Sequence, residues 1–260
     1  MNPAFETFAF EHAGQERTVY QLPHPGAPGV LLLQELPGLT PHTLDLAQRL
    51  HDDGFAVYLP HLFGRMGEAP SVAANLLDIC IRREFAILFR RKTSVFTEWL
   101  RALARHVQVQ TARPVGAIGM CLTGGFALSL IIDDAVAAPV ASQPAHLGLA
   151  WQEQWKRGLG LDADDEARAL SCAAKGKTPF MAMRFKDDPM CPKERFDRYE
   201  EIFGERLVRV ELDTPPVRTQ AGPPHSVLTL EYDPAPGSPT RAAYEQMVAY
   251  FRQHLGPTAG

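Results

Sequence analysis

The stretch Arg113-Pro114-Val115-Gly116-Ala117-Ile118-Gly119-Met120-Cys121-Leu122-Thr123-Gly124-Gly125-Phe126-Ala127-Leu128 decides the fold of this chain. Its apolar run up to Ile118 predicts a buried strand, and after Gly124 apolar residues return at helical spacing. Cys121 lies at the turn between the two. Small residues before and after a nucleophile let the backbone turn sharply from strand to helix, as Gly119 and Gly124 would here. The stretch therefore predicts a turn that holds the Cys121 side chain above a sheet.

This geometry suits acyl transfer, because a tetrahedral oxyanion needs preorganised N–H donors beside the attacking atom. Two other interpretations were weighed. A lone cysteine in an apolar segment is more often a small core residue than a reactive one. The stretch also nearly matches a phosphate-binding loop, but Gly125 and Phe126 stand where that motif needs Lys and then Ser or Thr. A nucleotide site is therefore excluded.

The composition bounds the size and the partners of the protein. Of its 260 residues, 26 are basic and 30 acidic, and the net charge is -4. The two signs are interspersed, which does not favour nucleic acid or an anionic membrane as a partner. The length can hold one large α/β domain with a substantial core. Because no internal repeat, low-complexity block or linker is evident, we expect a single domain over residues 1–260.

The cysteine and histidine patterns bound the compartment and the cofactors. The 4 cysteines form no C-x-x-C pair, so reduced thiols are expected rather than disulfides. The 9 histidines form no H-E-x-x-H motif, and neither a metal nor another cofactor is expected. The N-terminus lacks a basic start, and no apolar run approaches the roughly 18 residues of a membrane span. We expect a cytoplasmic protein, monomeric or a small homo-oligomer.

Predicted strands and helices alternate along most of the chain. Residues 5–10 and 18–22 are expected to form an antiparallel hairpin at a sheet edge. Further strands are expected at residues 29–34, 55–60, the run ending at 118, 135–141, 179–184 and 207–212, and helices at 41–54, 73–91, 94–107, after Gly124, 164–174, 192–204 and 239–256. The alternation predicts a doubly wound, mostly parallel sheet flanked by helices on both faces.

Four chemically capable residues fall at or just past predicted strand ends: Glu35, Cys121, Asp188 and His225. Ligands of doubly wound sheets bind beyond the carboxyl ends of the strands, so these side chains can share one site. The order Cys121, Asp188, His225 is the nucleophile, acid and histidine order of the α/β-hydrolase fold. In that chemistry the histidine takes the thiol proton and later protonates the leaving group, while the acid orients the ring.

Two choices among neighbouring residues complete this predicted site. Leu122 N–H is expected to be one oxyanion donor, and Leu36 N–H, in the loop after the third strand, is favoured as the other. Asp187 could serve as the acid in place of Asp188. We favour Asp188 because its spacing to the expected helix start at Pro192 fits.

Four segments resemble the dienelactone hydrolase family, also called carboxymethylenebutenolidases. They are Gln34-Glu35-Leu36-Pro37-Gly38, Gly119-Met120-Cys121-Leu122-Thr123-Gly124-Gly125, Asp188-Pro189-Met190-Cys191-Pro192 and His225-Ser226. The similarity spans about residues 29–255 and implies one α/β-hydrolase domain without a cofactor. It implies hydrolysis of a small ester or lactone substrate through a cysteinyl acyl-enzyme. By this resemblance Cys121 is the nucleophile, His225 the base and Asp188 its partner.

The resemblance further implies that Glu35 contacts the thiol and helps to activate it. The strand before Glu35 lies beside the strand before Cys121 in this fold, so the two side chains can meet. A nearby anion would keep the thiol protonated, and less easily oxidised, until substrate displaces the carboxylate. The alternative is a carboxylate that only caps or ties a loop.

The sequence departs from the family at two positions. Thr123 replaces the glycine expected two residues after the nucleophile, which predicts a slightly altered turn. Thr229 stands where the family has an arginine that holds a substrate carboxylate, four residues after the histidine. Other arginines could substitute, namely Arg82, Arg83, Arg184 and Arg218. Dienelactone itself is therefore not favoured as the substrate.

Three functions stay open at this point. The leading one is a cysteine-dependent hydrolase of a small ester or lactone, because nucleophile, base, acid and oxyanion loop occur together. The same residues would permit acyl transfer from a thioester to an acceptor other than water. The third is a non-catalytic relative that keeps the fold and binds a ligand without turnover.

Overall fold

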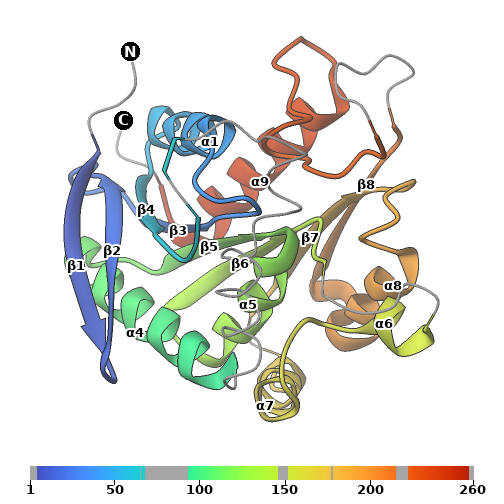
Figure 1. Cartoon of the computed structure of the whole chain (residues 1–260), viewed down its shortest axis with the longest axis horizontal. Coiled ribbons are helices and arrows are strands. Elements are labelled where there is room, and N and C mark those ends of the chain that lie inside the picture. Colours follow the sequence, from blue (N-terminus) through green and yellow to red (C-terminus); the bar gives the residue numbers. More distant parts are fainter. Residues whose placement is uncertain are drawn as a thin grey trace.

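The computed structural model describes residues 5–64, 66–67, 93–145, 152–176, 178–214 and 222–257, and within them the chain forms an eight-stranded sheet (Figure 1). The strands are β1 (Glu6–His12), β2 (Gln15–Leu22), β3 (Gly29–Leu33), β4 (Ala56–Pro60), β5 (Val115–Met120), β6 (Val136–Ser142), β7 (Phe180–Phe185) and β8 (Leu207–Leu212). Their order across the sheet is β1-β2-β4-β3-β5-β6-β7-β8. Strands β3 to β8 pair in parallel, whereas β1 and β2 are antiparallel to their neighbours. The predicted edge hairpin and mostly parallel sheet are confirmed.

Helices cover both faces of the sheet, as Figure 1 shows. They are α1 (Pro41–Asp52), α4 (Thr93–Thr111), α5 (Gly124–Ser129), α6 (Glu153–Arg157), α7 (Ala163–Ala174), α8 (Lys193–Phe203) and α9 (Pro239–Leu255), with short 3-10 turns η1 (Cys121–Thr123), η2 (Leu130–Ile132) and η3 (Gly204–Arg206). One core layer packs α1 and α9 against the sheet. On the other face, α4 and α5 pack under the middle of the sheet, and α7 and α8 under β7.

Strand β3 shows why the sequence produces this arrangement. All five of its residues are buried. Val30 and Leu32 face the layer of α1 and α9, while Leu31 and Leu33 face α4 on the other side. Successive side chains of a strand point to opposite faces, so a strand covered on both faces must be apolar throughout. This continuous apolar run places the end of β3, and with it Glu35, in the middle of the sheet.

Helix starts follow their sequence signals. Thr40 caps α1 by accepting a hydrogen bond from the Thr43 backbone N–H, and Pro41 occupies the first turn. Ser238 and Pro239 start α9 in the same way. A side-chain acceptor before the helix and a proline just inside it satisfy or remove N–H groups that have no intrahelical partner.

Three details differ from the sequence prediction or extend it. Helix α4 runs to Thr111, beyond the predicted end at 107. The short helix α6 was not predicted, because five residues are too few to show a helical period. The helix predicted at 73–91 lies outside the described residues.

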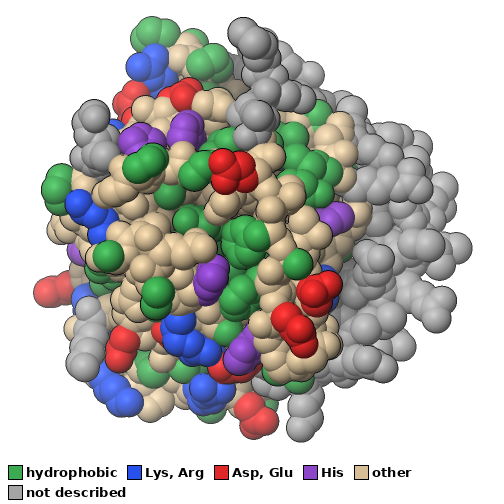
Figure 2. All heavy atoms as spheres, turned by 90° about the vertical axis from the view of Figure 1, so that its left-hand side faces the viewer, with side chains coloured by type: hydrophobic (Ala, Val, Ile, Leu, Met, Phe, Trp, Pro, Cys, Tyr) green, Lys and Arg blue, Asp and Glu red, His purple; other side chains and the backbone are tan. Residues whose placement is uncertain are grey.

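No helix in the described ranges is both long and apolar enough to cross a bilayer. Figure 2 shows the side of the molecule that carries the β1–β2 edge, where basic and acidic side chains of the described residues are interspersed. Among the described residues on this face, neither sign of charge gathers into a continuous patch.

Candidate active site

Cys121 follows the last residue of β5 and has a φ of 53°. A residue with a side chain rarely adopts this left-handed backbone conformation, which costs about 1–3 kcal/mol and persists only where the surroundings impose it. The chain then continues through η1 into α5. This is the sharp strand-to-helix turn that the sequence predicted.

Two glycines allow the turn because backbone passes close to them. A Cβ at Gly119 would lie 2.3 Å from the carbonyl oxygen of Thr123, and a Cβ at Gly124 would lie 2.7 Å from the Cα of Pro144. Real Cβ atoms do not approach other atoms so closely. Small residues are thus required on both sides of Cys121.

Thr123 fits the turn without backbone strain, and the expectation that it alters the turn slightly stays a prediction. Its φ of -86° is one that any residue adopts, so a glycine is not needed there. Its hydroxyl also accepts a hydrogen bond of 2.9 Å from the backbone N–H of Met120. The threonine therefore braces the turn around Cys121.

Asp188 and His225 come together beyond the ends of β7 and β8. Asp188 Oδ2 lies 2.7 Å from His225 Nδ1, and Asp188 Oδ1 accepts a hydrogen bond of 2.9 Å from the Met190 N–H. Asp188 is buried, whereas its neighbour Asp187 is exposed. Of the two aspartates, the structure joins Asp188 to the histidine.

Two neighbouring groups act on the His225 ring. Burial by itself lowers the pKa of His225, but electrostatic attraction to Cys121 and the hydrogen bond with Asp188 raise it well above the ordinary value. Its Nε2 atom is buried and has no hydrogen-bond partner of ordinary geometry in the described part of the chain. The ring thus lies between a carboxylate on its Nδ1 side and the thiol of Cys121, which interacts with it electrostatically.

Glu35 follows β3 by two residues and is buried. Its Oε2 accepts hydrogen bonds of 2.9 Å from Ser226 Oγ and 3.1 Å from Gln143 Nε2, and its Oε1 accepts one from the Thr229 hydroxyl. The predicted contact with the Cys121 thiol is not among its hydrogen bonds in the described residues. The carboxylate ties down the turn that follows His225.

The predicted oxyanion donors lie where the sequence placed them along the chain. Leu36 directly follows Glu35, and Leu122 follows Cys121 in η1. Their role as donors stays a prediction.

Of the four arginines considered for a substrate carboxylate, Arg184 is already engaged. It is 3% exposed, forms an ion pair of 2.6 Å with Glu211 and donates a hydrogen bond of 2.9 Å to the carbonyl of Cys191. Its charge therefore serves the fold. The other three, Arg82, Arg83 and Arg218, lie outside the described residues.

Other residues singled out in the sequence have structural partners. His61 Nε2 is hydrogen-bonded to the Gly64 carbonyl at 3.0 Å, as expected of a satisfied loop histidine. Cys191 is buried, and burial raises the pKa of its thiol, which makes it unreactive. Cys172 is half-buried in α7, and Cys80 lies outside the described residues.

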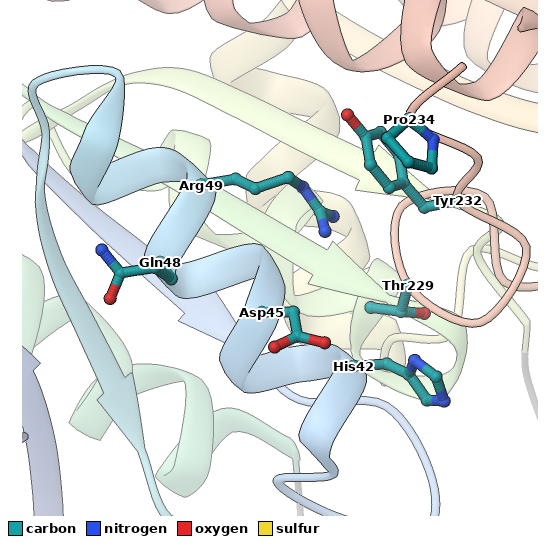
Figure 3. Close-up of a pocket in the computed structure, with 7 residues that line it drawn as sticks. All are labelled: His42, Asp45, Gln48, Arg49, Thr229, Tyr232 and Pro234. Atoms are coloured by element: carbon teal, nitrogen blue, oxygen red, sulfur yellow. The ribbon is translucent and has the colours of Figure 1, made fainter. Parts of the chain in front are cut away.

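A cavity of about 430 Å³ lies between α1 and the segment after His225 (Figure 3). It is lined by His42, Asp45, Gln48, Arg49, Thr229, Tyr232 and Pro234. The Arg49 guanidinium stacks on the Tyr232 ring at 3.7 Å and donates a hydrogen bond of 2.6 Å to the Leu228 carbonyl. Arg49 thus supports the segment after His225 from the side of α1.

No cluster of metal-binding side chains occurs within the described ranges.

Two residues that the sequence did not single out for a role organise this site. Gln143, at the end of β6, bonds to Glu35. Arg195 is buried and donates hydrogen bonds to the carbonyls of Pro144, at 2.6 Å, and Met190, at 3.1 Å. Arg195 thus joins the loop that carries Asp188 to the segment after β6. Gln143 carries a signal like that of Glu35, a polar side chain within two residues of the end of a buried parallel strand.

The sheet is mostly parallel and is covered by helices on both faces. A strained cysteine follows β5, an acid follows β7 and a histidine follows β8. This arrangement is that of the α/β-hydrolase fold. The family model for the dienelactone hydrolase family matches residues 17–255, and the chain belongs to that family. The family is one of hydrolases that act on ester or lactone bonds.

Solved structures share the fold at low sequence identity. A dienelactone hydrolase-like promiscuous phosphotriesterase from metagenomic libraries is 18% identical, with a TM-score of 0.65 over 97% of this chain and 99% of that one. A dienelactone hydrolase from Anabaena variabilis is 16% identical, with a TM-score of 0.57 over 98% of this chain and 100% of that one. An esterase from Pyrococcus furiosus is 12% identical, with a TM-score of 0.56 over 97% and 93%. A search of curated protein sequences gave no significant match.

Proposed function

We propose that this protein hydrolyses a small carboxylic ester or lactone with Cys121 as nucleophile, His225 as general base and Asp188 as the partner of the histidine. The observation that carries the proposal is the hydrogen bond of 2.7 Å between Asp188 and His225, beside a cysteine held in a strained turn. Strained backbone in a packed surrounding is typical of a residue that must be presented to a substrate.

In the first half of the reaction, His225 Nε2 takes the thiol proton and the Cys121 sulfur attacks the carbonyl carbon. A sulfur–carbon bond forms, and the carbonyl electron pair moves onto oxygen. The N–H groups of Leu36 and Leu122 would stabilise this oxyanion. His225 then protonates the leaving alkoxide as the carbon–oxygen bond breaks, which leaves a cysteinyl thioester. With a lactone, the leaving hydroxyl stays attached to the acyl group.

In the second half, His225 accepts a proton from water while the water oxygen attacks the thioester carbon. The carbon–sulfur bond breaks, the thiolate regains the proton from His225, and the carboxylic acid departs. Asp188 Oδ2 holds the Nδ1 proton throughout, which keeps Nε2 directed at the reacting atoms. Glu35 contributes a fixed negative charge and, through Ser226 and Thr229, the position of the histidine turn.

The partners of Thr229 and Arg184 bear on how the substrate is selected. Thr229 replaces the family arginine and is bonded to Glu35, and Arg184 is bound to Glu211. We therefore infer a substrate that is not selected through an arginine at position 229 or 184. Hydrolysis rates of matched esters with and without a carboxylate on the acyl group test this inference. A strong preference for the charged ester that survives Arg82→Ala, Arg83→Ala and Arg218→Ala variants would contradict it.

Trapping the acyl-enzyme tests the mechanism. The protein is mixed with a panel of lactones and activated esters and quenched in acid, and its peptides are weighed by mass spectrometry. The expected result is an acyl adduct on the peptide that contains Cys121, absent from Cys121→Ala. Equal turnover by the wild type and Cys121→Ala would overturn the proposal. Product analysis completes the test, since free acid indicates hydrolysis and a conjugated acceptor indicates acyl transfer.

A further inference from the structure

Gln143 follows β6 directly, is fully buried and has a φ of 34°. Apart from Cys121, it is the one buried residue with a side chain among the described positions that adopts a positive φ. Such a conformation persists only where surrounding contacts impose it. The contacts of Gln143 therefore matter more than those of an ordinary residue at a strand end.

Its side chain joins three segments that are far apart in the sequence. Nε2 donates a hydrogen bond of 3.1 Å to Glu35 Oε2, and Oε1 accepts one of 3.3 Å from the Val227 N–H. Oε1 also accepts a hydrogen bond from the neighbouring Ser142 hydroxyl. The backbone N–H of Gln143 donates to the Met183 carbonyl at 2.7 Å, which ties the residue to β7.

The polarity of these partners requires an amide. An ionised carboxylate only accepts hydrogen bonds, so the NH₂ end must face Glu35, and a backbone N–H only donates, so the carbonyl end must face Val227. A glutamate at position 143 would keep the second contact and replace the first by repulsion between two carboxylates. The amide thus serves both sides without a change in its protonation.

Together, Gln143 and Glu35 hold the turn that follows His225 through three of its residues. Glu35 binds the hydroxyls of Ser226 and Thr229, and Gln143 binds the backbone of Val227 between them. His225 is the residue directly before this turn. A shift of the turn would therefore move the imidazole relative to Cys121.

Building on the proposed function, we propose that Gln143 is a positioning residue of the hydrolase: its amide orients Glu35 and the turn after His225 so that the imidazole stays aligned with Cys121. It touches no reacting atom and acts through these two partners. A misplacement of about 1 Å can lower a rate about a hundredfold, so the alignment has a measurable effect on catalysis.

The test is a double-mutant cycle on positions 35 and 143, measured with p-nitrophenyl acetate as the substrate. Gln143→Glu is expected to lower kcat at least about tenfold with little change in KM, because the bound substrate is met by a misaligned histidine. The exchange variant Glu35→Gln/Gln143→Glu restores one donor opposite one carboxylate. It is expected to regain a large part of the kcat lost by Gln143→Glu. If the factors by which the two single variants lower kcat simply multiply in the double variant, the proposal is overturned.

A matched control separates positioning from stability. Tyr250→Phe removes another buried hydrogen bond to β6, of 3.3 Å to the Pro139 carbonyl in the middle of the strand. Gln143→Met, which keeps the size but loses all three side-chain hydrogen bonds, should lower kcat far more than Tyr250→Phe at a similar loss of melting temperature. Equal losses of kcat in the two variants would show that position 143 acts only through stability.

A measurement without turnover keeps this test apart from the proposed function. The rate at which iodoacetamide alkylates Cys121 at neutral pH reports how well His225 activates the thiol. It should fall in Gln143→Glu and recover in the exchange variant, whether or not the wild type hydrolyses the ester. An unchanged alkylation rate in Gln143→Glu would refute the positioning role. Absence of ester hydrolysis in the wild type would refute only the proposed function.

Discussion

Cys121, the proposed nucleophile, and His225, the proposed base, are held in place by different means. Cys121 is positioned by its own backbone, in a strained turn that nearby glycines and Thr123 support. His225 lies beyond the last strand and is held by residues distant in the sequence: its ring is hydrogen-bonded to Asp188, and the next residues, Ser226 and Val227, donate hydrogen bonds to Glu35 and Gln143.

This difference has a physical consequence. The turn at Cys121 is closely packed, because Thr123 and Pro144 leave no room for a side chain at Gly119 or Gly124. A turn held by side-chain hydrogen bonds responds to each bond that is removed. Changes near Cys121 should therefore act on the fold or abolish activity, whereas changes around His225 should lower activity in graded steps.

The largest expected effect is that of Cys121→Ala. Removing the nucleophile of a triad lowers kcat by about 10⁴-fold or more, since no other group can take its place. Initial rates with an activated aryl ester provide the measurement, and Cys172→Ala, at a half-buried cysteine away from the site, is the matched control. A loss of less than tenfold would show that the strained turn does not present a nucleophile.

Asp188→Asn should have the next largest effect, a loss in kcat of about 10²-fold to 10⁴-fold, because the histidine loses the carboxylate that orients it. Asp187→Asn, at the exposed neighbour, should leave kcat almost unchanged. If the two variants lose activity equally, the acid has been assigned to the wrong residue.

Asp188→Asn should also change how the free energy of unfolding depends on pH. The pKa of His225 is raised well above the ordinary value of 6.5, despite a burial that lowers it, by Cys121 and Asp188. The folded state therefore binds the proton more tightly than the unfolded chain does. The stability from this group is fully present below about pH 6.5 and is lost as the pH rises through the raised pKa. Asp188→Asn should flatten this decline in denaturant unfolding measured from pH 6 to pH 9, and an unchanged decline would contradict the prediction.

On the Cys121 side, Gly119→Ala should destabilise the protein by about 1–3 kcal/mol, as is typical of overpacking. The added Cβ would lie 2.3 Å from the Thr123 carbonyl oxygen. Gly176→Ala is a suitable control, because nothing lies within 4 Å of its added Cβ and only its φ of 75° resists the change. Thermal unfolding of both variants measures the difference, and equal stability would show that the turn is not held by this contact.

The smallest effect is expected from Arg49→Lys, outside the histidine turn. Lysine cannot keep both the stacking on Tyr232 and the hydrogen bond to the Leu228 carbonyl, so a loss of about 1 kcal/mol and a few-fold lower kcat are expected. Arg241→Lys, which changes an ion pair on the surface of α9, serves as the control. If Arg49→Lys lowers kcat more than Gln143→Met does, Arg49 contributes more than Gln143 to the position of His225, contrary to this prediction.

The elements that carry the site could be predicted from the sequence because their signals are local. The apolar run before Glu35 and the glycines around Cys121 lie within a few residues of the feature that they predict. The identity of the acid as Asp188, rather than its neighbour, followed from the spacing to Pro192, and the structure places that carboxylate on the histidine. Helix α6 escaped prediction because it is shorter than two turns.

By itself, the sequence determined the alternation of strands and helices, the strained turn at Cys121 and the order of the residues that meet above the sheet. These depend on periodicity and on local steric limits, which neighbouring residues set. Only the tertiary structure decided that Glu35 binds Ser226, Thr229 and Gln143, and that Arg184 is taken up by Glu211. Contacts between residues on different strand ends, from 27 to 194 positions apart, depend on where the packed sheet places each strand end, and no local pattern encodes that placement.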